Sequence, residues 1–139
     1  MISKTASLFC LLLGIMPSAF YCSELVPLEF FGYHKGWNEK TLRMMADING
    51  DGKPDIVGFG DDFVYTSLNK GDGIFTTPKL VSNWLGTTKY PNDIFPRIMV
   101  DMNGDGKADI VWFGSKHVYI YHSNGDGTFD SPIWARTYG

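Results

Sequence analysis

The sequence contains few cysteines and no long apolar stretch. Its two cysteines, Cys10 and Cys22, both lie near the N-terminus, so the rest of the chain cannot form a disulfide and needs another source of stability. Twelve Lys and Arg against fifteen Asp and Glu give a net charge of -3, and no basic patch points to a nucleic-acid partner. No apolar run is long enough to span a bilayer. A chain of 139 residues is expected to hold one small domain.

The first residues of the chain have the pattern of a secretory signal peptide. Lys4 supplies a positive charge, residues 8–16 form a short apolar core, and the small residues Ser18 and Ala19 follow. Cleavage is expected after Ala19 or nearer Cys22. We therefore predict a signal peptide over residues 1–22, secretion to the extracellular space and no membrane span.

The chain also lacks any constellation of residues that is typical of an enzyme. Eight of its twelve aspartates fall in two loops and two turns that repeat along the chain, and the remaining acids form no evident pair for acid–base catalysis. His117 and His122 are five residues apart in an expected strand, so they point to opposite faces and do not make a metal pair. No Gly-x-Ser-x-Gly motif or phosphate-binding glycine loop occurs. We therefore predict a protein without catalytic activity.

What the sequence does contain is an internal repeat with a period of 54 residues. Residues 47–80 align with residues 101–134 without a gap and share 18 identities in 34 positions. In each repeat a short apolar segment leads into an aspartate-rich loop. A β-branched run ending in Phe-Gly, a third apolar segment and a Gly-Asp-Gly turn follow, and Phe75 or Phe129 is expected to open a fourth strand.

Four short strands per repeat are the plan of a propeller blade. We predict an all-β fold of two four-stranded β-propeller-type blades. The expected parts are residues 23–46 for the tail of a preceding blade, a linker and a first strand, 47–82 for repeat 1, 83–100 for a linker and first strand, and 101–139 for repeat 2. Propellers use about 4 to 8 blades, so either copies of the chain associate to complete a propeller or the chain is a fragment of a larger one.

The aspartate-rich loops, residues 47–55 and 101–109, have the spacing of a calcium site. Calcium takes six to eight oxygen ligands, which a tight loop can supply from alternate positions. The expected ligands are Asp47, Asn49, Asp51, the carbonyl of Lys53 and Asp55 in the first loop, and Asp101, Asn103, Asp105, the carbonyl of Lys107 and Asp109 in the second. We therefore predict one calcium ion per loop.

Two other interpretations of these loops were weighed. An EF-hand needs a bidentate Glu at position 12 and flanking helices, whereas position 12 here is Gly58 or Trp112 within strand-like sequence. The loops could instead be Asn-Gly and Asp-Gly hairpin turns without metal. The recurrence of every oxygen ligand in both loops favours calcium.

The loops DINGDGKPD and DMNGDGKAD, the runs IVGFG and IVWFG, and the FGYxxGW segment at residues 31–37 resemble the FG-GAP or VCBS repeat superfamily. Within it, the chain is similar to the fungal lectin family of the Psathyrella velutina type, which forms seven-bladed propellers. The resemblance covers residues 28–139. It implies calcium in the loop between the first two strands of a blade, and sugar binding between adjacent blades with N-acetylglucosamine-type ligands.

Six residues near the expected blade edges are candidates for contact with a sugar. Aromatic faces stack on the apolar side of a pyranose, and polar groups add hydrogen bonds. The candidates are Tyr33, Trp37, Arg43, Tyr90, Arg97 and Trp112. Packing between blades is the alternative role for the two tryptophans, and a structural salt bridge is the alternative for the two arginines.

The two linkers differ, because residues 85–93 lack the Gly-Trp pair found at residues 36–37. Only one linker therefore carries the aromatic platform that the family resemblance leads us to expect. The sequence predicts a secreted, calcium-binding and carbohydrate-binding module. The alternative is a calcium-stabilised adhesion or scaffold module that binds no sugar.

Overall fold

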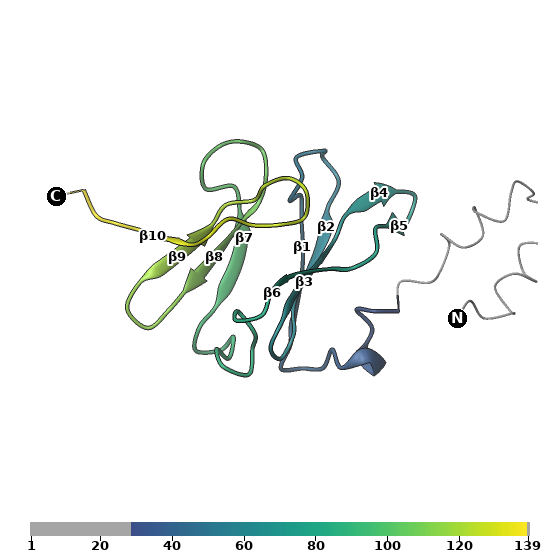
Figure 1. The fold of residues 1–139 in the computed structure, drawn as a ribbon, viewed down its shortest axis with the longest axis horizontal. Coiled ribbons are helices and arrows are strands. Elements are labelled where there is room, and N and C mark those ends of the chain that lie inside the picture. The colour runs from purple at the N-terminus through teal and green to yellow at the C-terminus, as the bar shows by residue number, and fades with distance from the viewer. Residues whose placement is uncertain (1–28, 139) are drawn as a thin grey trace, which may run out of the picture.

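The computed structural model describes residues 29–138 as two four-stranded antiparallel sheets lying side by side (Figure 1). The expected signal peptide, with Cys10 and Cys22, lies outside the described residues. Within residues 29–138 no helix is long and apolar enough to cross a membrane. The all-β prediction of two four-stranded sheets is therefore confirmed.

Each repeat forms one sheet, and neighbouring strands in a sheet are joined in antiparallel register. In the first sheet the order is β1-β2-β3-β6, and in the second it is β7-β8-β9-β10. The strands of the first sheet are β1 Leu42–Ala46, β2 Asp55–Phe59, β3 Val64–Ser67 and β6 Lys79–Ser82. Those of the second are β7 Arg97–Val100, β8 Asp109–Phe113, β9 Val118–Tyr121 and β10 Ile133–Trp134.

The fourth strand of the first sheet begins later than the sequence suggested. Phe75 belongs to a small hairpin formed by β4 Asn69–Gly71 and β5 Ile74–Phe75, and the fourth strand β6 starts only after Pro78. Proline has no N–H to donate to a ladder, so β6 pairs with β3 from Lys79 onward. A single 3-10 turn, η1 Tyr33–Lys35, precedes the first sheet.

The hydrophobic core lies between the two sheets. Side chains alternate along a strand, and in the register of the first sheet Val57, Phe59 and Val64 share one face. This face packs against the face of the second sheet that carries Ile110 and Tyr121, and all five residues belong to one buried cluster. The front face of each sheet is defined here as the side bearing Ile56 in the first sheet and Ile110 in the second.

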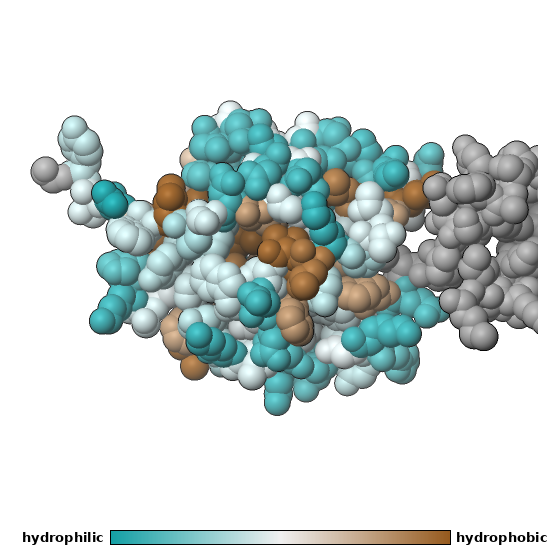
Figure 2. All heavy atoms as spheres, viewed as in Figure 1, coloured by the Kyte–Doolittle hydropathy of each residue, from teal (hydrophilic) through white to brown (hydrophobic). Residues whose placement is uncertain are grey.

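The opposite sides are called the back faces. The back of the first sheet, with Val57 and Phe59, meets the front of the second. Apolar side chains also reach the surface, and Figure 2 shows some of them gathered around the position that β6 has in Figure 1. The two sheets therefore face the same way, with the back of the first sheet against the front of the second.

Candidate functional site

Both aspartate-rich loops fold in the same way around their first aspartate. Asp47 accepts hydrogen bonds from the N–H groups of Gly50 at 2.7 Å, Asp51 at 3.2 Å and Gly52 at 2.8 Å. Asp101 accepts the equivalent three bonds at 2.7, 3.2 and 2.8 Å. The two glycines of the first loop have φ values of 79° and 83°, which a residue with a Cβ resists.

The second aspartate of each loop is paired with the lysine two residues later. Lys53 Nζ lies 2.8 Å from Asp51 Oδ2, and Lys107 Nζ lies 2.8 Å from Asp105 Oδ2. These hydrogen bonds lower the pKa of both aspartates and raise the pKa of both lysines. Asn49 Oδ1 accepts the Asp51 N–H at 3.1 Å, and Asn103 Oδ1 accepts the Asp105 N–H at 3.0 Å.

The last aspartate of each loop is fully buried and ties the loop to its sheet. Asp55 accepts the N–H groups of Ile48 at 2.9 Å and Asn69 at 2.7 Å, and burial raises the pKa of its carboxyl group. Asp109 accepts the N–H groups of Met102 at 3.0 Å and Ser123 at 2.8 Å. Among residues 29–138 no group of three acidic, histidine or cysteine side chains converges as a metal cluster.

The two loops lie against each other across the boundary between the sheets. The N–H of Ala108, in the second loop, donates to the carbonyl of Asp47 in the first at 2.7 Å. Ser123 Oγ, beyond the second loop, donates to the carbonyl of Ile48 at 2.5 Å. Through these bonds the backbone of one loop supports the other.

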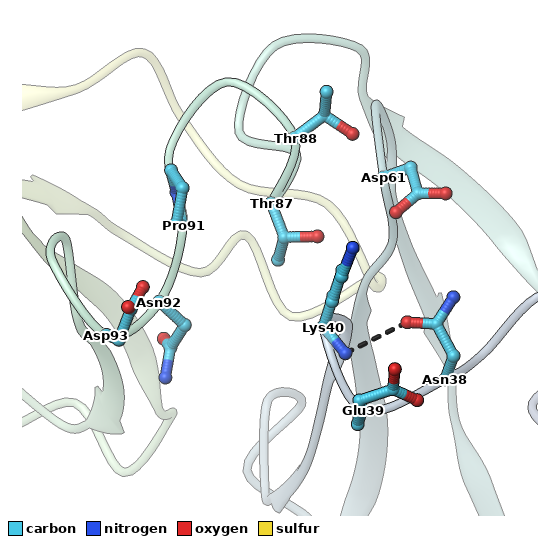
Figure 3. Close-up of a pocket in the computed structure, with 9 residues that line it drawn as sticks. All are labelled: Asn38, Glu39, Lys40, Asp61, Thr87, Thr88, Pro91, Asn92 and Asp93. Carbon is cyan, nitrogen blue, oxygen red and sulfur yellow. Dashed lines mark hydrogen bonds between the residues drawn. The ribbon is translucent and has the colours of Figure 1, made fainter.

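A polar groove of about 900 Å³ opens between the two sheets, away from the loops (Figure 3). It is formed by three segments: the stretch before β1, the turn between β2 and β3, and the linker before β7. Its lining residues are Asn38, Glu39, Lys40, Asp61, Thr87, Thr88, Pro91, Asn92 and Asp93. Figure 3 shows Lys40 and Thr87 turned into the space between these segments.

One wall of the groove is held by a close approach of two backbones. The N–H of Thr87 donates to the carbonyl of Gly60 at 2.8 Å, and the N–H of Thr88 donates to that of Asp61 at 2.9 Å. A Cβ placed on Gly86 would lie 2.1 Å from the Asp61 carbonyl oxygen. Only glycine therefore permits this contact, which positions the linker against the turn of the preceding sheet.

The groove presents hydrogen-bonding groups of both kinds. Carboxylates come from Glu39, Asp61 and Asp93, an ammonium from Lys40, and an amide from Asn92. The amide oxygen of Asn92 is buried and has no hydrogen-bond partner within the described part of the chain. Buried polar atoms are normally satisfied, so this oxygen would gain a partner from a bound polar molecule only if the Asn92 side chain rotated into the groove.

None of the six residues proposed from the sequence for sugar contact lines this groove. The two arginines instead have equivalent structural roles. Arg43 donates to the carbonyl of Phe31 at 2.8 Å, and Arg97 donates to that of Leu85 at 3.0 Å, one repeat later. Arg97 is buried, and its guanidinium also bonds the carbonyls of Phe95, Gly86 and Tyr90.

The aromatic candidates are mostly packed inside. Trp37 is buried against Phe31 and Gly58. Trp112 is buried, stacks on Tyr119 with ring centroids 4.9 Å apart, and meets Tyr90 edge-on at 4.7 Å. Tyr33 is the exception, since its side chain is exposed.

The groove residues could have been found from the repeat itself. Asn38 and Glu39 recur 54 residues later as Asn92 and Asp93, and both pairs line the groove. The six residues expected to contact a sugar are aromatic residues and arginines, so this polar pair was not among them. Asp61 carried no such signal, because its equivalent is Ser115.

Comparison with known families and structures agrees with the repeat plan. Residues 101–138 match the family model of the FG-GAP-like repeat. A lectin of Agrocybe aegerita, described as recognising non-reducing terminal N-acetylglucosamine, is 40% identical, with a TM-score of 0.69 over 75% of this chain. The match covers 26% of that lectin, so the chain spans about a quarter of its length.

Two toxin assemblies share the fold alone. The TcdB2-TccC3-Cdc42 structure is 19% identical with a TM-score of 0.59, over 77% of this chain and 6% of that one. The Photorhabdus luminescens Tc holotoxin pore is 20% identical with a TM-score of 0.57, over 74% and 5%. A comparison with curated proteins returns no significant match.

Proposed function

We propose that the chain, whose residues 101–138 match an FG-GAP-like repeat, is a secreted, calcium-stabilised module that binds carbohydrate in the groove between its two sheets. The observation that carries the proposal is the 40% identity, over 75% of this chain, to a lectin described as recognising N-acetylglucosamine. The signal-peptide pattern of residues 1–22 supports secretion. The match covers only 26% of that lectin. Sugar binding by this chain is therefore proposed for the groove that its own two sheets form.

The groove offers hydrogen-bonding groups that suit a sugar. Hydroxyl groups of a pyranose donate to carboxylates, and both Asp61 and Asp93 line the groove. The amide of Asn92 would add a donor and an acceptor once its side chain turns toward the ligand. A charged partner makes a hydrogen bond stronger than a neutral one. We propose N-acetylglucosamine-type glycans as the ligand class.

The test is a glycan array with the calcium-loaded protein, followed by calorimetric titration of the best ligand. Asp61→Ala is expected to weaken binding at least about tenfold, since a hydrogen bond to a charged group is worth about 1.5–3 kcal/mol. Asp62→Ala is the matched control, because Asp62 is also exposed and adjacent but does not line the groove. Equal losses in the two variants, or no binding to any glycan, would count against the lectin proposal.

One observation favours the alternative function of a scaffold without sugar binding. No lining residue of the groove is aromatic, whereas sugar sites usually stack a pyranose on an aromatic ring. In that case calcium would stabilise the fold in the array experiment but no glycan would bind.

Calcium suits the chemistry of both loops. Each loop offers oxygen donors only: two aspartate carboxylates and an asparagine amide at its first three alternate positions, and a buried aspartate at its end. Each carboxylate oxygen of Asp55 accepts one N–H group and keeps a second lone pair. Asp109 accepts the equivalent two N–H groups, and its Oδ2 also lies 3.0 Å from His122 Nδ1. When bound, calcium would supply positive charge that links these oxygens.

The lysine of each loop bears on how calcium would enter. The ammonium of Lys53 pairs with Asp51 at 2.8 Å, and Lys107 pairs with Asp105 at the same distance. Both lysines are partly exposed, so a rotation of the lysine side chain toward solvent would release the carboxylate. We propose that Asp47, Asn49, Asp51 and Asp55, with the carbonyl of Lys53, hold the ion in the first loop. The equivalent residues would hold it in the second.

The module is also proposed to associate with further copies of itself. Repeat arrays gain much of their stability from interfaces between neighbouring repeats. Residues 29–138 contain one such interface, between the two sheets. Contiguous exposed apolar patches, unlike single exposed apolar residues, mark interaction sites.

A further inference from the structure

The two sheets bury equivalent positions of their back faces unequally. Phe59 is 0% exposed, whereas Phe113, its equivalent one repeat later, is 39% exposed. In the loops, Ile48 is 0% exposed, whereas its equivalent Met102 is 47% exposed.

Val111 and Ile120, in the middle of the back face of the second sheet, are buried, but Ile98 at its edge is exposed. The back of the first sheet is therefore covered, whereas the back of the second is open around its margin.

What covers the back of the first sheet is the front of the second. Arg97, on the front of the second sheet, lies with its guanidinium carbon 5.3 Å from the centre of the Phe59 ring. Thr66, on the back of the first sheet, donates to the carbonyl of Gly127 at 2.7 Å. Ile110 completes the buried cluster from the second sheet. The chain thus contains one example of the partner that a back face accepts.

The front of the first sheet is open in the complementary way. Met45 is 55% exposed, whereas its equivalent Met99 packs against the core. Tyr33, in the turn beside this face, is 65% exposed. Phe31 and Trp37 cover the part of this face at Gly58. Within residues 29–138, one back face and one front face are therefore partly open, and they correspond to the two halves of the internal interface.

We infer that the back face of the second sheet docks on the front face of the first sheet of another copy, in the relation that the two sheets have within one chain. The occupant is thus a second copy, and the internal interface is the template for the junction. A head-to-tail contact of this kind uses different surfaces on the two copies and can extend or close into a ring.

The junction would also build a second groove, of different character from the internal one. In the junction groove, the place that Asp61 has in the internal groove is taken by Ser115, 54 residues later, from the copy that supplies its back face. The place of Thr87 is taken by Tyr33, 54 residues earlier, from the copy that supplies its front face. The copy that supplies its back face would also supply Asn92 and Asp93 to the junction groove. Their equivalents Asn38 and Glu39 line the internal groove.

Tyr33 gives the junction groove the aromatic face that the internal groove lacks. An exposed phenol ring can stack on a pyranose while its hydroxyl makes a hydrogen bond. This step rests on the proposed carbohydrate binding, whereas the docking of the two faces does not. Sugar binding is therefore expected to strengthen as the copies assemble.

The test is complementation between two blocked variants, followed by sedimentation. Phe113→Lys places a charge on the back of the second sheet, and Met45→Lys places one on the front of the first. Each variant alone is expected to be monomeric, since only one docking face remains. Their mixture is expected to form a dimer, because the back face of the Met45→Lys chain can dock on the front face of the Phe113→Lys chain.

Ile74→Lys is the matched control, since Ile74 is exposed but lies in the β4–β5 hairpin, on neither face. It is expected to keep the size of the unmodified chain. Circular dichroism identifies any variant that fails to fold, and Ile98→Lys then replaces Phe113→Lys on the same back face. A monomeric unmodified chain, equal behaviour of Ile74→Lys and Phe113→Lys, or no dimer in the mixture would overturn the inference.

Sugar titration of the assembled chain and of the monomeric variants separates the two proposals. Assembly with no binding of N-acetylglucosamine would remove the proposed carbohydrate function and leave the docking faces standing. Binding that is equal in the monomeric variants and in the assembly would confine the sugar to the internal groove, and would overturn the junction groove. Tyr33→Ala should weaken binding by the assembly and leave binding by the monomeric variants unchanged.

Discussion

The two repeats fill the same space with different residues. In the second sheet the indole of Trp112 projects from β8 itself, whereas the equivalent position in β2 is Gly58. A Cβ at Gly58 would lie 2.3 Å from the Trp37 ring, so an indole from the preceding linker occupies the room that glycine leaves. Both repeats therefore have a packed indole at the same place in the blade, although it comes from the linker in the first repeat and from the strand in the second.

A second comparison concerns the recurring arginine. Arg43 and Arg97 both donate to the carbonyl of the equivalent linker residue. Arg43 is exposed and makes this bond alone, whereas Arg97 is buried and bonds four carbonyls. The difference arises because the second sheet covers the back of the first, which encloses Arg97 at the joint between the sheets.

The largest expected effect tests the aromatic exchange. Trp112→Ala and Trp37→Ala should each cost about 3–5 kcal/mol of unfolding free energy, because each removes a buried indole. Urea denaturation measures the loss. Trp134→Ala serves as the control, since Trp134 is half exposed and should cost less than about 1 kcal/mol. A loss for Trp37→Ala as small as that of the control would show that the linker indole does not stabilise the first sheet as Trp112 stabilises the second.

The arginine comparison predicts the next effect. Arg97→Ala should cost about 3 kcal/mol, since four carbonyls lose their charged donor and two of these hydrogen bonds are buried. Arg43→Ala should cost less than about 1 kcal/mol, because only one part-buried hydrogen bond is lost. Burial also lowers the pKa of Arg97 to about 10. Equal losses in the two variants, measured by thermal and urea unfolding, would contradict the difference between the repeats.

Calcium should then act on the two loops alike. Calorimetry of chelator-treated protein is expected to show two ions with dissociation constants on the order of 10⁻⁴ to 10⁻³ M. A hundredfold excess of free calcium over the dissociation constant should stabilise the fold by ~2.7 kcal/mol, seen as a rise in melting temperature that chelator reverses.

Single substitutions separate the two ions. Asp51→Ala and Asp105→Ala should each remove one ion and leave the other loop able to bind. Because Ala108 joins the loops through the carbonyl of Asp47, loss of one ion should also weaken the other slightly. No uptake in the unmodified protein would disprove the calcium proposal.

The smallest expected effect is on the acid side of the pH scale, without calcium. Backbone N–H groups lower the pKa of Asp101 in the folded chain. A carboxyl group whose folded pKa is depressed contributes stability above its unfolded pKa, and this is lost as the pH falls through the folded value. Asp101→Asn should therefore flatten the loss of stability between about pH 5 and about pH 3. An unchanged slope in urea titrations would show that these bonds contribute nothing.

The strands were predictable because each repeat carries its own pattern. A first strand was expected at the end of residues 23–46, and β1 is Leu42–Ala46, since the local apolar sequence determines it. The start of β6 was misjudged because Phe75 was read as part of the strand, although Pro78 cannot donate to the ladder.

The groove could not be predicted in the same way. It exists because two segments far apart in sequence approach each other, and the close contact of Gly86 with Asp61 is not visible in local periodicity. Whether Trp37 faced solvent or packed was also undecidable, because its neighbours in sequence are polar while its neighbour in space is Gly58. The roles of the predicted calcium and sugar residues stay predictions.

The contact between Gly86 and the turn at Asp61 has a consequence for the shape of any assembly. It joins backbone to backbone, with 2.1 Å between an imagined Cβ and a carbonyl oxygen, so no side chain acts as a spacer that could lengthen or shorten. This backbone contact therefore fixes the angle between successive blades. In a closed ring, that angle determines the number of blades. Gly32, one repeat earlier, lies where the same hinge would form between copies. A methyl group at Gly86 would therefore force the linker away from this turn and change the angle between the two blades, in addition to destabilising the contact.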